Sequence, residues 1–76
     1  MESIFTTNIS IGNKSASYHV YFDHEKYIFM PEPPEEGLPT FSIKREHDEW
    51  HDQDPIDPDL KDQAVEALEG YLLKQH

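Results

Sequence analysis

The sequence predicts an α+β protein in which an antiparallel β-meander of four to five strands packs against one C-terminal helix. Apolar and polar residues alternate through most of the first half of the chain, which is typical of strands with one buried face. Near the other end, apolar residues recur at steps of three and four, which is typical of an amphipathic helix. At 76 residues, the chain has the length of a single domain.

The first two strands are expected at residues 4–11 and 14–22. Between them, Gly12 and Asn13 fit a two-residue type II′ turn, because glycine readily takes a positive φ. A four-residue loop is the alternative, and both registers keep the same face of the hairpin apolar. Strict alternation places Ile4 on the opposite, more polar face.

A third strand is expected at residues 26–30, after a turn at His24 and Glu25. A two-residue loop there places Phe22 opposite Tyr27, and so brings the aromatic residues of both strands to one face. The proline-rich residues 31–37 then predict a connecting loop, because proline cannot continue a central strand or a helix.

Residues 40–46 and 49–51 are expected to form a second hairpin. With a two-residue turn between them, Arg45 lies opposite Trp50 and can stack on the indole ring. The predicted core of the sheet consists of large apolar residues that share one face. These are Phe5, Ile9, Tyr18, Val20, Phe22, Tyr27, Phe29, Phe41, Ile43 and Trp50.

A helix is expected at residues 58–75. Asp57 can cap its first turn, and Pro58 suits the first helical position, where a missing N–H costs nothing. The apolar stripe that would face the sheet consists of Leu60, Ala64, Ala67, Leu68, Tyr71 and Leu72. Gly70 interrupts the exposed side and weakens the helix.

The packing residues of the second half of the chain occur in a particular order: Phe41-Ser-Ile43, then Trp50, then the Leu60–Leu72 stripe. In this respect the chain resembles a group of small bacterial proteins of uncharacterised function, in which a β-meander precedes a C-terminal helix. A weaker similarity is to HicB-like antitoxins, whose core continues with a strand after the helix. The resemblance covers most of the chain and implies a fold, but no activity.

The chain carries sixteen acidic residues against six basic ones, for a net charge of −10. This charge argues against binding to nucleic acid or to an anionic membrane. The absence of cysteine excludes disulfides and thiolate metal sites. No apolar run is long enough to cross a membrane, and the N-terminal residues show no signal-peptide core, so a cytoplasmic protein is expected.

Residues 46–62 hold eight acids and a single base, Lys61. One interpretation is a solvated acidic linker; the other is a surface that steers and binds a basic protein partner. The leading hypothesis is therefore a non-enzymatic interaction module. The acidic residues of its predicted surface are Glu46, Asp48, Glu49, Asp52, Asp54, Asp57 and Asp59.

The face of the sheet opposite the helix offers a second interaction surface. Tyr21, Ile28 and Met30 are expected on it, and a homodimer could bury them. His19 is expected among them as part of the same patch. The alternative is that the serine and threonine residues of this face keep it solvated.

The alternative function is a small metal-binding protein. His47, His51, Asp52 and Asp54 combine imidazole and carboxylate ligands that suit zinc or nickel. No third nitrogen or sulfur ligand is spaced to complete the site, and the same residues also fit a solvated hairpin tip. No catalytic Ser/His/Asp order and no glycine-rich phosphate loop is evident, so neither an enzyme nor a bound cofactor is expected.

Overall fold

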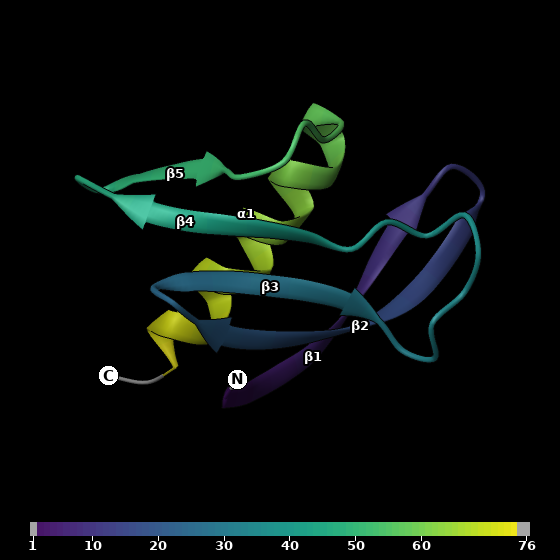
Figure 1. The fold of residues 1–76 in the computed structure, drawn as a ribbon, viewed down its shortest axis with the longest axis horizontal. Coiled ribbons are helices and arrows are strands. Elements are labelled where there is room, and N and C mark those ends of the chain that lie inside the picture. The colour runs from purple at the N-terminus through teal and green to yellow at the C-terminus, as the bar shows by residue number, and fades with distance from the viewer. Residues whose placement is uncertain (1, 75–76) are drawn as a thin grey trace.

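The computed structural model describes residues 2–74, which form one five-stranded antiparallel sheet and one helix. The strands follow one another across the sheet in chain order, with β1 and β5 at its two edges (Figure 1). The elements are β1 (Glu2–Ile11), β2 (Lys14–Asp23), β3 (Lys26–Pro31), β4 (Phe41–Glu46), β5 (Glu49–Asp52) and α1 (Pro58–Leu73). This is the α+β meander that the sequence predicts.

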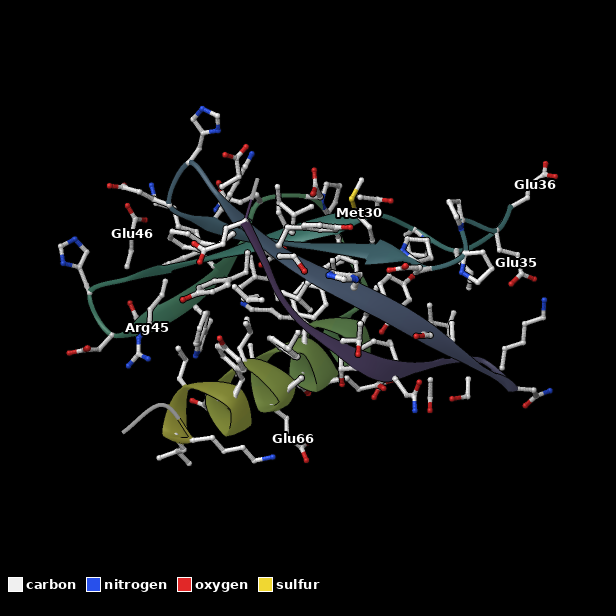
Figure 2. The ribbon with its side chains drawn as sticks, turned by 90° about the horizontal axis from the view of Figure 1, so that it is seen from below. Met30, Glu35, Glu36, Arg45, Glu46 and Glu66 are labelled. Atoms are coloured by element: carbon white, nitrogen blue, oxygen red, sulfur yellow. The ribbon has the colours of Figure 1, made fainter. Side chains whose placement is uncertain are left out.

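Helix α1 covers one face of the sheet and leaves the other uncovered. Seen along the sheet in Figure 2, the helix lies on one side, while Met30 projects from the other. The helix begins as predicted, because the Asp57 carboxylate accepts a hydrogen bond from the backbone N–H of Asp59 at 2.9 Å and Pro58 follows the cap. No helix in the described residues is long and apolar enough to span a membrane.

The buried core lies between the sheet and α1. It contains six of the predicted sheet residues and three residues of the helix stripe: Ile9, Tyr18, Val20, Phe29, Phe41, Ile43, Leu60, Ala64 and Leu68. Phe5, Tyr27 and Trp50 pack at its margin. Phe29 and Phe41 stack with their ring centroids 4.9 Å apart, so two buried aromatic rings pack together where β3 meets β4.

All three hairpins have two-residue turns. In the first, only Gly12 has a positive φ (62°), which fits the predicted type II′ turn. In the other two, both central residues have a positive φ: 50° and 64° at His24 and Glu25, and 53° and 66° at His47 and Asp48. Positive φ at both positions is the signature of a type I′ turn, which matches the right-handed twist of the strands.

These turns set the predicted registers. Ile9 lies opposite Ala16, as the two-residue loop requires, so the four-residue alternative is wrong. In the last hairpin, Arg45 lies opposite Trp50, and its guanidinium carbon is 5.3 Å from the centroid of the indole ring. The stacking predicted for this pair is therefore confirmed.

The structure corrects the predicted side of Ile4. The register of β1 shifts between Ser3 and Phe5, so a β-bulge interrupts strict alternation. Ser3 lies opposite Tyr21 on the uncovered face, whereas Ile4 packs against the core. The bulge places Ile4 beside apolar residues, whereas strict alternation would place it on the uncovered face.

The element bounds differ from the prediction by a residue or two. The strand expected to end at residue 30 includes Pro31, whose nitrogen faces away from β2 at a position where β4 has not yet begun. The helix ends at Leu73, and Lys74 is its C-cap. Gln75, the last residue of the predicted helix, lies outside the described residues.

Tyr18 connects the core to the proline-rich loop that the sequence predicts. Its side chain is fully buried, and its hydroxyl donates a hydrogen bond of 2.8 Å to the carbonyl oxygen of Pro39. Burial raises the pKa of this hydroxyl, because the charged form loses its hydration. The loop between β3 and β4 is thereby tied to the centre of the sheet.

Candidate functional site

The predicted acidic surface keeps most of its carboxylates in contacts within the chain. Three pair with basic side chains: Glu46 with Lys44 at 3.7 Å, Asp48 with Arg45 at 3.8 Å, and Asp52 with Lys61 at 3.3 Å. Three more accept hydrogen bonds: Asp54 from Ser42, Asp57 from Asp59, and Asp59 from Gln63. Of the seven, only Glu49 has no such contact within residues 2–74.

Asp52 shows how these contacts bind the segment to the rest of the fold. The pKa of its carboxyl is lowered, first by a hydrogen bond from its own backbone N–H and then by the Lys61 ammonium on α1. Both favour the charged form. Asp52 therefore joins this segment to the helix, while residues 52–55 stay exposed to solvent.

The predicted metal ligands do not converge. His51 and Asp52 are consecutive residues of β5, so their side chains point to opposite faces of the sheet. His47 lies in the turn before the strand, and the Asp54 carboxylate is occupied by the backbone N–H of Ser42 at 3.2 Å. Within the described residues, no group of three or more His, Asp or Glu side chains could hold a metal ion.

The helix carries a different set of acids. Asp62, Glu66 and Glu69 follow one another at steps of four and three, so they form one line along the exposed side of α1. We call these three residues the acidic ridge. All are exposed, and none forms an ion pair with another described residue. Figure 2 shows Glu66 projecting from the helix on the side away from the sheet.

The uncovered face of the sheet brings together the three residues predicted there. Tyr21 and Ile28 are direct cross-strand partners, and Met30 lies two residues further along β3. All three are only partly exposed. The His19 ring stacks on Tyr21 at 4.5 Å between centroids, so polar groups cover part of this patch.

His19 lies at the centre of a hydrogen-bond chain that the sequence analysis missed. Its Nε2 atom meets the hydroxyl of Ser3, and its Nδ1 atom lies 2.7 Å from a carboxylate oxygen of Glu32. The order of hydroxyl, imidazole and carboxylate is that of a serine hydrolase. The three residues come from β1, β2 and the loop after β3, at separations of sixteen and thirteen residues, so no local motif could have indicated them.

The described residues place no groove beside this hydrogen-bond chain. A nucleophile also needs donors placed for the oxyanion and a hollow that holds the substrate. Ser3, His19 and Glu32 lie on the open sheet face, and none of them lines the grooves that the described residues form beside α1. We interpret these hydrogen bonds as structural: through His19 on β2, they hold the start of β1 and the residue that follows β3.

A groove lies along the other side of β1, between this edge strand and α1. Its volume is about 490 Å³, and its walls include Thr6 and Asn8 of the strand and Glu66 and Gly70 of the helix. At one end, Phe5 and Tyr71 stack with their ring centroids 4.7 Å apart. One acid of the ridge therefore borders the groove.

Comparisons with known proteins supply no further guide: no family model, curated protein or solved structure matches this chain.

Proposed function

We propose that the protein is a non-enzymatic interaction module that binds a basic protein partner through its acidic surface. The observation that carries this proposal is the distribution of charge. Four of the six lysine and arginine side chains are held in ion pairs within the chain. The acidic ridge, in contrast, has no internal counter-ion among the described residues.

The ridge is preferred to the segment around β5 because its charges are available. A carboxylate that already pairs with lysine or arginine must give up that contact before it binds a partner. Exposed ion pairs each contribute about 0.2–1 kcal/mol. Three free carboxylates can therefore contribute about 0.6–3 kcal/mol to binding at low salt, and they also steer the approach of a positive surface.

The test compares two variants with the same change in net charge. One neutralises the ridge (Asp62→Asn, Glu66→Gln, Glu69→Gln), and the other neutralises Glu46, Asp48 and Glu49 in the β4–β5 hairpin. The probe is a synthetic ten-residue peptide of alternating lysine and valine, with affinity measured by calorimetry at two salt concentrations. The ridge variant should bind roughly tenfold more weakly, and the hairpin variant within about twofold of the native chain.

The matched charge separates a defined surface from general attraction between opposite charges. Equal losses in both variants would mean that the peptide responds only to net charge, and the ridge would lose its assigned role. Binding that does not weaken with added salt would contradict the electrostatic basis of the proposal. Both variants should keep the native amide NMR spectrum, since all six side chains are exposed.

A further inference from the structure

The edge of β1 has backbone groups that no described residue satisfies. The two-residue turn makes Ile11 and Lys14 a hydrogen-bonded pair, and such pairs alternate along an antiparallel hairpin. The N–H and C=O groups of Thr6, Asn8 and Ser10 therefore point away from β2. Within residues 2–74, those of Thr6 and Asn8 form no hydrogen bond.

Ser10 shows what these groups can bind. Its N–H donates to Oε1 of Gln63 at 2.8 Å, and its carbonyl accepts from Nε2 of the same side chain at 2.8 Å. A primary amide that donates and accepts at once imitates the peptide group of a neighbouring strand. Helix α1 thus already places one amide where a sixth strand would run, and the free positions continue from there along the groove.

The groove beside Thr6 and Asn8 has room for side chains of such a strand. On the helix wall it is lined by Ala67 and Gly70, and a methyl group added at Gly70 would meet no heavy atom within 4 Å beyond its own helix. No close contact in the fold therefore requires glycine at this position, although glycine weakens a helix. Gly70 therefore leaves open space at this point of the groove wall.

We propose that an extended basic segment of a partner protein binds in this groove as a sixth strand, paired with the β1 backbone. The inference rests on the proposed function and gives it a site and a binding mode. Strand addition to a free sheet edge uses the backbone for affinity and alternate side chains for specificity. Here an apolar side chain would fill the space over Gly70, and a lysine or arginine would lie beside Glu66.

Charge identifies the occupant as a basic partner rather than a second copy of this chain. Pairing two β1 edges would bring together two molecules that each carry a net charge of −10. The groove wall itself carries one acid, Glu66, and one base, Lys74, so the repulsion comes from the net charge of the whole molecule. Repulsion of this kind keeps strongly charged proteins apart, whereas the same field attracts a positive segment.

The first test removes one outward donor from β1. Asn8→Pro deletes the free N–H without touching the hydrogen bonds to β2, and proline is tolerated on an edge strand where its nitrogen faces outward. Asn8→Val is the matched control, since it changes the same side chain but keeps the N–H. With the lysine–valine peptide as probe, the proline variant should bind roughly tenfold more weakly and the valine variant normally.

Gly70→Leu is a second variant, in which misfolding could not explain a loss of peptide binding. Leucine favours the helix, so the Tm should rise, while the side chain fills the groove and binding should fall at least about tenfold. A peptide methylated on alternate backbone nitrogens probes the same contact without changing the protein. Methyl groups on the nitrogens that face β1 should abolish binding, whereas methyl groups on the opposite set should not.

Hydrogen exchange gives the deciding measurement. Peptide binding should slow the exchange of the Thr6 and Asn8 amide protons, which lack partners in the free chain. Salt-sensitive binding that leaves these two amides unprotected would overturn the strand-addition proposal while the proposed function survives. No binding at all would remove both. Protection that rises with protein concentration in the absence of peptide would identify a second copy as the occupant and would also overturn the proposal.

Discussion

Strand β5 closes one edge of the sheet with four residues, whereas β1 presents ten residues at the other. Charged side chains occupy β5 at Glu49 and Asp52, and the chain then turns back over the rest of this edge. There the N–H of Gln53 donates to the carbonyl of Ser42, and the Asp54 carboxylate accepts from the N–H of Ser42. On β1, no charged residue lies between Ser3 and Ile11.

The two edges differ in how well they are protected against pairing with a strand of another molecule. A free edge can pair with any passing strand, and natural sheets prevent this with short strands, charges and covering loops. The β5 edge has all three. The β1 edge has only Gln63 at Ser10 and a helix alongside, so its middle is open but flanked. An edge that is flanked rather than covered suits selective strand addition.

The largest expected effect on stability comes from weakening the packing of α1, the helix that flanks β1. Leu68 is fully buried between α1 and the sheet. Leu68→Ala should therefore lower the free energy of unfolding by about 2–5 kcal/mol, measured by urea denaturation. Leu73→Ala is the control on the same helix, because this leucine is 74% exposed and its loss should cost less than about 0.5 kcal/mol. Similar costs for the two variants would contradict the packing of α1 described above.

At the β5 edge, the hydrogen bonds that cover β4 can be removed by substituting Asp54. Its carboxylate accepts from both the N–H and the hydroxyl of Ser42, which is only 7% exposed. Asp54→Ala would leave these donors unpaired and should destabilise the fold by about 1–3 kcal/mol in urea denaturation. Asp54→Asn keeps an acceptor oxygen and should lose less than half as much. If the two substitutions prove equal, the charge and not the hydrogen bonds would explain the role of Asp54.

A smaller effect is expected at the corresponding contact on β1. Gln63→Ala removes both hydrogen bonds to Ser10, which are partly exposed to solvent, and should cost about 1–2 kcal/mol. The exchange of the Ser10 amide proton should become as fast as that of Thr6 and Asn8. Gln63→Glu keeps only the acceptor, so it should protect the Ser10 N–H but lose stability. Unchanged exchange in the alanine variant would show that Gln63 does not cover this edge.

The smallest effect concerns the charge on β5. The pKa of Asp52 is lowered, so its contacts stabilise the fold above the ordinary range of a carboxyl and cease to do so as the pH falls through the lowered value. Lys61→Met should raise this pKa only part of the way, because the backbone N–H of Asp52 remains as the first cause. An NMR titration of the Asp52 carboxyl measures the change. The stability difference between the two proteins should begin to shrink below about pH 4 and vanish only once the pH has fallen below the lowered pKa.

The hairpins could be predicted because their determinants are local. Two-residue turns at Gly12, His24 and His47 fix which residues lie opposite one another, and alternation then fixes the buried face. Ile4 was misplaced because a bulge depends on how the edge strand meets the core, which alternation does not describe.

The candidate site was harder to predict for the same reason. Sequence alone shows where acids are dense, but not which of them find partners. Asp52 and Lys61 come from different elements, and their pairing leaves the ridge of α1, not the segment around β5, as the free acidic surface. Density along the chain indicates the seven predicted carboxylates, but it carries no information on which of them pair with basic side chains.

The sequence by itself determined the elements, their order, the registers of the second and third tight hairpins and, Ile4 apart, the buried face of the strands, because these follow from turn geometry and side-chain period within a few residues. Tertiary structure alone decided which edge stays open. The contact of Gln63 with Ser10 joins residues 53 positions apart, and the chain of Ser3, His19 and Glu32 joins three separate elements. Such contacts depend on how α1 lies across the sheet and where the chain returns, and no local pattern specifies either.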